Sequence, residues 1–161
     1  YMINILPQVD KMNRGAWLET GMLIECLRDV EVLRVIGGAV YPPSTVISHG
    51  DTPAEFFRNS HGVVTPTHFW KLVATKADGL FAKDNGLIAF WMPNSVEAIA
   101  KNIDQYVVSI TELENNLKNA LGSKKRAGWP AESVSEIFDL PQSVKDHVPK
   151  YWGTLDGCDR S

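Results

Sequence analysis

Apolar residues along the chain fall into five short runs and two helically spaced segments. The short runs are rich in β-branched and aromatic residues and are bounded by Gly, Pro, Asn or Asp, which predicts strands. They cover residues 1–6, 32–41, 69–74, 87–92 and 106–108. An Asn85-Gly86 pair precedes the fourth run, and this dipeptide favours a tight hairpin turn. We therefore expect residues 69–74 and 87–92 to form an antiparallel pair.

The first helical segment extends from Asn13 toward Val30. Its apolar side chains lie near one stripe, and Asn13 is a good N-cap residue. Gly15 and Gly21 weaken this helix, each by about 1 kcal/mol relative to alanine. The apolar residues of the segment include Ala16, Leu18, Met22, Leu23, Cys26, Leu27 and Val30.

The second helical segment passes through Leu113, Leu117 and Leu121 and is expected to end at Gly122. Ser109 and Glu112 have the spacing of a capping box at its start, and Thr111 and Glu114 repeat that spacing. Weaker helical patterns lie at residues 53–59, 95–102 and 133–136. The first of these falls within a long polar surface loop predicted over residues 44–64. The pattern predicts an α+β domain over residues 1–161, a mainly antiparallel twisted sheet with a helix on each face.

The amino-acid composition is that of a globular protein and excludes only a few classes of function. The 161 residues are 44% hydrophobic and 22% charged, with a net charge of −3, which excludes a broadly basic nucleic-acid coat. A local basic cleft remains compatible with that charge. No apolar run reaches the roughly 18 residues that a membrane span needs. Two cysteines are too few for a disulfide scaffold.

General catalytic motifs are absent from the sequence. It contains no Gly-rich phosphate loop, no Gly-x-Ser-x-Gly elbow and no pair of histidines at helical spacing. We expect His68, beside Trp70, to have a structural role, and the other histidines (His49, His61 and His147) offer no evident partner. Cys26 lies on the apolar stripe of the first helix, which predicts a small buried hydrophobic residue. Cys158 is either idle or redox-active.

One stretch of the sequence carries motifs specific enough to suggest a protein family. Asn4-Ile5-Leu6-Pro7-Gln8, a short spacer and Asn13-Arg14-Gly15-Ala16-Trp17 resemble the Asn-x-x-Pro-Gln and Asn-x-x-Ala-Trp motifs of the DNA/RNA non-specific endonucleases of the ββα-metal type. This family includes secreted bacterial nucleases and mitochondrial endonuclease G. Residues 35–41, 66–71, 89–94 and 108–113 are also similar to its core segments. The resemblance covers residues 1 to about 121.

The resemblance implies a magnesium-dependent hydrolase of phosphodiester bonds in DNA and RNA, with little regard for sequence or sugar. Asn13 matches the family's metal ligand, for Mg²⁺ or another divalent cation such as Mn²⁺. The residues expected to contact nucleic acid are Asn4, Gln8, Arg14 and Arg28. The resemblance also leaves a homodimer open, implies no membrane, and leaves a secreted or a mitochondrial location open.

Two departures from the family pattern matter. The family's general-base histidine lies in an Asp-Arg-Gly-His motif, which we expect upstream of Tyr1, so no catalytic base is assigned here and the chain alone should be inactive. The family's helix glutamate is replaced by Gly21, and Glu25 stands where several members have arginine. Glu19 or Glu25 could supply the acid, and Arg28 the cation. The alternative is a degenerate nuclease-like domain that binds nucleic acid or a protein without cutting.

Overall fold

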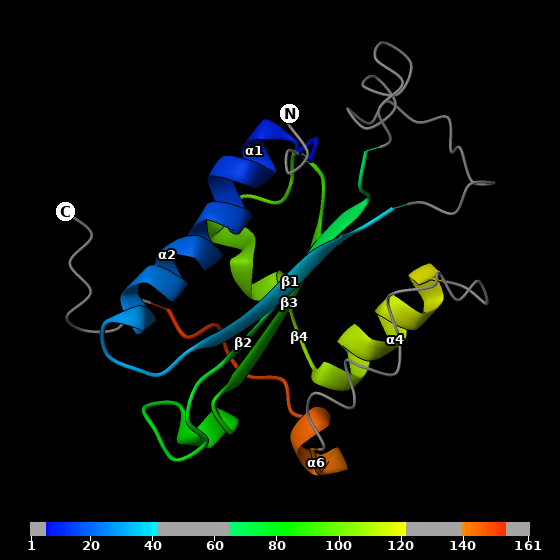
Figure 1. Cartoon of the computed structure of the whole chain (residues 1–161). Helices are drawn as coiled ribbons and strands as arrows, with labels where there is room; N and C mark the ends of the chain where they lie inside the picture. The colour runs from blue at the N-terminus through cyan, green and yellow to red at the C-terminus, as the bar shows by residue number, and fades with distance from the viewer. Residues whose placement is uncertain (1–5, 42–64, 122–139, 154–161) are drawn as a thin grey trace.

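The computed structural model describes residues 6–41, 65–121 and 140–153. Outside these residues lie most of the predicted strand 1–6, the polar stretch 44–64 with its helical turn, the turn at 133–136, and the predictions for Asn4, His49, His61, Gly122 and Cys158. A broken helix opens the described chain, four strands follow, and two further helices come last (Figure 1). The elements are α1 (Asp10–Met12), η1 (Asn13–Trp17), α2 (Leu18–Arg28), β1 (Arg34–Val40), β2 (His68–Ala74), η2 (Ala82–Asp84), β3 (Leu87–Pro93), η3 (Ala100–Tyr106), β4 (Val107–Val108), α4 (Ile110–Leu121) and α6 (Gln142–Lys145).

The four strands form one antiparallel sheet in the order β1-β2-β3-β4. The hairpin between β2 and β3 confirms the predicted pair, and Asn85 takes the left-handed conformation at its turn. The register places Gly37 of β1 directly opposite Lys71 of β2. Neither Gly37 nor Gly38 can carry a side chain, since a Cβ on either would lie 2.9 Å from an atom of Trp70.

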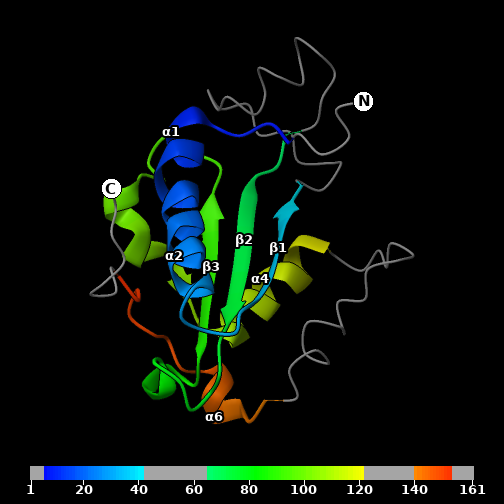
Figure 2. The ribbon, with the colours of Figure 1, turned by 60° about the vertical axis from the view of Figure 1, so that its left-hand side comes forward.

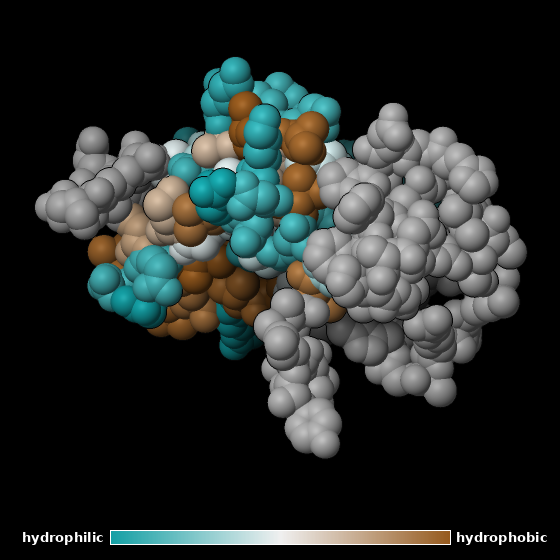
Figure 3. Space-filling model, turned by 90° about the horizontal axis from the view of Figure 1, so that it is seen from above, coloured by the Kyte–Doolittle hydropathy of each residue, from teal (hydrophilic) through white to brown (hydrophobic). Residues whose placement is uncertain are grey.

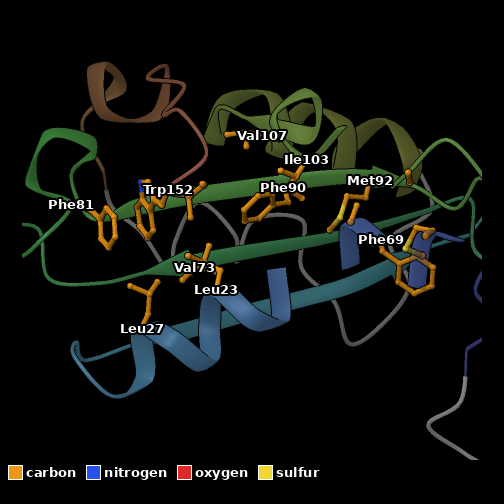
Figure 4. Packing of buried hydrophobic residues seen from close by; sticks show 14 of the residues in the cluster. Leu23, Leu27, Phe69, Val73, Phe81, Phe90, Met92, Ile103, Val107 and Trp152 are labelled. Atoms are coloured by element: carbon orange, nitrogen blue, oxygen red, sulfur yellow. The ribbon is translucent and has the colours of Figure 1, made fainter. Parts of the chain in front are cut away.

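Helices cover both faces of the sheet, as the sequence predicts (Figure 2). Alternation along the strands sends Phe69 and Val73 to the face covered by α2, and Trp70 and Leu72 to the face covered by α4. Figure 4 shows Leu23 and Leu27 of α2 pointing toward the first of these faces. Each face of the sheet therefore has its own layer of buried apolar side chains.

The C-terminal described segment is attached to the turn of the β2–β3 hairpin. The Trp152 ring stacks on Phe81 at 3.9 Å between centroids, as Figure 4 shows. Its Nε1 donates to Asp84 Oδ2 at 2.9 Å, while His147 Nε2 lies 2.9 Å from Asp84 Oδ1. Because Asp84 is buried, these two partners replace the water that its carboxylate loses.

Asn94, just after β3, ties three separate segments together at the opposite end of the sheet. Its Oδ1 accepts from the Val9 N–H at 2.8 Å. Its Nδ2 donates to the Pro7 carbonyl at 3.2 Å and to the Pro66 carbonyl at 2.9 Å. The side chain is buried, so water cannot substitute for any of these bonds. Asn94 therefore determines where the segment before α1 lies.

Three local predictions are wrong. Asn13 is not an N-cap, because the helix starts at Asp10 and the Asn13 N–H already donates to the Val9 carbonyl. Residues 95–102 are mostly irregular, and the helical turns lie later, in η3. Cys26 is half-buried and disulfide-bonded, whereas periodicity alone predicts a free hydrophobic side chain. Ser109 is a confirmed cap, since its Oγ accepts from the Glu112 N–H at 3.0 Å.

We expect Asn94→Ala to lower the free energy of unfolding by roughly 1–3 kcal/mol, because it leaves three backbone groups, in two separate segments, without their hydrogen-bond partner. Chemical denaturation followed by circular dichroism would measure the change. Asn102→Ala is the matched control, since the Asn102 side chain makes one exposed bond, to the Glu97 carbonyl. Equal effects of the two substitutions would contradict the role assigned to Asn94.

Candidate active site

The helix that carries the candidate metal ligand is broken inside its second turn. Gly15 has non-helical dihedral angles (φ −108°, ψ −110°), and residues 13–17 form a π-helical turn. The Ala16 N–H leaves the helix ladder and donates to the Ala98 carbonyl at 3.1 Å. A Cβ on Gly15 would lie 2.8 Å from the Ile99 Cα, so only glycine allows this close approach. Such turns are frequent at functional sites.

Asn13 is exposed at the start of this π turn, and it has helical dihedral angles. Its amide is not used for capping, and within the described ranges no hydrogen bond to it is found. Mg²⁺ takes hard oxygen ligands and keeps several waters, so one amide oxygen together with substrate phosphate suffices to hold it. The described residues contain no group of three or more His, Cys, Asp or Glu that could form a full protein cage. Asn13 therefore fits a metal held largely by water.

A groove of about 530 Å³ lies beside η1, between the helix and the β1 edge of the sheet. Its polar side chains are Gln8 and Lys71, and its other walls are aromatic, aliphatic or glycine. The remaining lining residues are Leu6, Trp17, Val35, Gly37, Gly38 and Phe69. Figure 3 views the molecule from the α1 end and shows hydrophilic and hydrophobic residues interspersed over the described surface. The chain thus presents a small amphipathic groove one helical turn from Asn13.

Lys71 forms the floor of this groove. Its side chain is buried, and its Nζ donates to Thr20 Oγ1 at 2.7 Å and lies 3.9 Å from the centre of the Trp17 ring. Thr20 Oγ1 donates its own hydrogen to the Trp17 carbonyl, at 2.8 Å, so it can only accept from Lys71. No acidic side chain in the described ranges pairs with Lys71. Burial without a counter-ion lowers the pKa of Lys71 to about 8.

The two predicted phosphate-binding arginines are exposed and paired with acids. Arg14 bonds Asp10, which raises the pKa of Arg14 above its usual value. Arg28 contacts Glu25 at 2.6 Å and Asp29 at 3.4 Å. Exposed pairs of this kind contribute only about 0–1 kcal/mol, so phosphate can compete for either arginine. However, Arg28 lies roughly 22 Å along the helix from Asn13 and cannot share its phosphate. Asn4 lies outside the described residues.

Neither Glu19 nor Glu25 takes the place of the family's helix glutamate. Glu19 is buried and accepts from the Tyr151 hydroxyl at 3.1 Å, so its carboxylate is engaged in the core. Glu25 is paired with Arg28 farther along α2. Gly21, which occupies the acid's position, has open space where a Cβ would be, with no atom within 4 Å. A glutamate side chain would therefore fit at position 21, where this chain has glycine.

The two histidines in the described part of the chain lie away from Asn13. His68 stacks on Trp91 with 4.9 Å between ring centroids, and burial lowers its pKa. It alternates with Phe69 and so belongs to the α4 face of the sheet. His147 is bonded to Asp84 at the hairpin end. His68 thus has the structural role expected of it, and neither ring is placed as a base for this site.

Comparison with known proteins decides the family. Residues 1–123 match the sequence profile of the DNA/RNA non-specific endonucleases. The chain belongs to this family. The match covers the extent predicted from the motifs, and the antiparallel sheet with flanking helices agrees with the ββα-metal fold. No curated protein matches the chain.

Membership in the DNA/RNA non-specific endonuclease family implies hydrolase chemistry that depends on a divalent metal and acts on DNA and RNA. No helix in the described ranges is both long and apolar enough to cross a bilayer. Sequence reasoning singled out neither Lys71, which lines the groove, nor Thr20, which accepts its hydrogen bond. A lysine between Trp70 and Leu72 in a buried strand is the signal that could have identified the first of them, because such a strand rarely contains a charge.

The depressed pKa of Lys71 gives a pH dependence of stability with a definite sign. Between about pH 8 and the ordinary lysine pKa near 10.4, the unfolded chain holds the proton and the folded chain does not. The free energy of unfolding should therefore rise with pH in this window, by at most about 3 kcal/mol, relative to Lys71→Met. Urea denaturation of both proteins at a series of pH values measures it. Parallel profiles would contradict the burial of an unpaired ammonium.

Proposed function

We propose that this protein is the metal- and phosphate-binding part of a magnesium-dependent endonuclease that cuts DNA and RNA without sequence preference. The exposed, uncommitted amide of Asn13 beside the Lys71 groove is the observation that carries the proposal. When bound there, the metal would stabilise negative charge on the leaving oxygen. Contacts directed at phosphates and not at base edges account for the lack of sequence preference.

The roles of the chain's own residues follow from their positions. Asn13 offers its amide oxygen to the metal. Gln8 and Arg14 flank it and bind phosphate oxygens, and Asn4 is assigned the same role from the family pattern. Arg28 contacts a more distant phosphate of a bound strand. We assign the general base, from the family pattern, to a histidine outside these 161 residues. Residues 1–161 are proposed as part of one domain, which the bonds from Tyr151 to Glu19 and from Trp152 to Asp84 support.

A second candidate function rests on Gly21. With no acid at this position and Glu25 held by Arg28, the domain has the features of a nuclease-like module that binds without cutting. A nucleic-acid-binding module would lose affinity steeply with salt, whereas a protein-binding module would not.

Removing the metal ligand tests the primary proposal. We expect Asn13→Ala to weaken Mn²⁺ binding, followed by electron paramagnetic resonance, by about tenfold or more. Asn115→Ala removes an exposed asparagine from α4, on the other face of the sheet, and should leave Mn²⁺ binding unchanged. An unchanged Mn²⁺ affinity in Asn13→Ala would remove the basis of the metal site.

Supplying a base tests the reaction. With Mg²⁺ alone, the 161-residue protein should leave supercoiled plasmid intact, because general-base catalysis contributes roughly 10²- to 10⁴-fold. Added imidazole should then produce Mg²⁺-dependent nicking that Asn13→Ala abolishes. Nicking by Mg²⁺ alone would show that the base lies inside the chain, and its absence under all conditions would favour the binding module.

Restoring the acid separates the two candidate functions. Gly21→Glu should be accommodated, since the Cβ position is open. If the protein is a nuclease, we expect the imidazole-dependent nicking rate to rise about tenfold or more. Gly21→Gln has the same shape without the charge and is the control. Equal rates for the two variants would argue against a catalytic role for a carboxylate at this position.

A further inference from the structure

The most unusual charge in the described structure is the buried ammonium of Lys71. Its side chain is 8% exposed, and no carboxylate in the described ranges neutralises it. Burying a charge without a partner is costly, and surface lysines avoid it by extending into water. Lys71 nevertheless lines a groove. A buried charge in that place suggests a role in binding a ligand and not a role in core packing.

The donors of Lys71 are only partly used. An ammonium group has three N–H donors. One is directed to Thr20 Oγ1 at 2.7 Å, and the Trp17 ring at 3.9 Å interacts with the positive charge but takes no conventional hydrogen bond. Thr20 is fully buried, so it holds the ammonium in one place and acts as a positioning residue. Capacity for an external acceptor remains on the groove side.

The groove is kept open above Lys71 by the strand next to it. The residue directly opposite Lys71 is Gly37, and a Cβ at that position would lie 2.9 Å from the Trp70 carbonyl. Cross-strand side chains normally cover one another at about 5 Å. Because no side chain can exist at Gly37, nothing on β1 covers the lysine from that side. Gln8 adds an amide donor at the rim.

We propose that Lys71 is a substrate-binding residue that holds a phosphodiester oxygen of a nucleic-acid strand in this groove, with Gln8 bonding the same group. The inference rests on the proposed function and specifies how this site holds its substrate. Phosphate is an acceptor-only anion that matches an ammonium and an amide, whereas a carboxylate-rich protein partner would need more than one buried cation. The aromatic wall of Trp17 and Phe69, with ring centroids 5.4 Å apart, accommodates the adjoining sugar or base.

Binding of a short fluorescein-labelled oligothymidylate, measured by anisotropy in EDTA, tests the proposal without metal or cleavage. We expect Lys71→Met to weaken binding about tenfold, and to reduce the slope of log K against log salt by about 0.7. Lys76→Met removes an exposed lysine two residues beyond the end of β2 and should change affinity less than about twofold. Thr20→Val, which removes the acceptor that holds the ammonium, should weaken binding by less than Lys71→Met does.

Thermal unfolding of Lys71→Met provides the fold control. We expect the variant to fold, because it removes a buried charge and keeps the aliphatic stem; if it does not, Thr20→Val takes its place in the binding assay. Unchanged affinity and salt slope in the folded variant would overturn the role of Lys71 and leave the nuclease proposal standing. Failure of the unaltered protein to bind the oligonucleotide at any salt, together with failure of Mg²⁺-dependent nicking, would overturn both.

Discussion

The site depends on a single buried amide. The Asn94 side chain bonds backbone groups of Pro7, Val9 and Pro66, which belong to two distant stretches of the chain. Each of those groups has lost water, and an unsatisfied buried donor or acceptor costs about 1–3 kcal/mol. The amide is the only neutral side-chain group that can accept one hydrogen bond and donate two at once. It thereby brings the segment with Gln8 to the same end of the sheet as Phe69 and α1.

A second constraint, at Gly15, shapes the helix that follows this segment. Gly15 interrupts the helix because Ala98 and Ile99 approach it too closely for any Cβ. The Ala16 N–H then finds its acceptor on Ala98 and not in its own helix. The resulting π turn leaves Asn13 exposed with its amide uncommitted, while Trp17 turns toward Phe69 and Lys71. The interruption of the helix is thus compensated by a hydrogen bond between segments.

The positive charge in the groove is a local feature that the net charge of the chain does not reveal. The chain carries a net charge of −3, yet the groove contains the Lys71 ammonium, which no acidic side chain of the described residues neutralises. Charges in a concave region of low dielectric act more strongly than the same charges on an open surface. Attraction of a phosphate therefore does not require a basic surface, and composition alone would have argued against a polyanionic substrate.

The sequence by itself determined the family, the antiparallel hairpin and the helix on each face, since these depend on local periodicity, turn residues and motif spacing. It also marked Asn13 as a candidate. Ser109 as a cap also follows from spacing within one helix turn. Only the tertiary structure decided that Asn13 is no N-cap, that Cys26 is disulfide-bonded and that Lys71 lies in a groove. Each of these depends on contacts between segments far apart along the chain, as from Thr20 to Lys71 and from Val9 to Asn94. A pattern of neighbouring residues records which side chains are apolar or polar, but it does not record which distant group will satisfy a buried polar atom.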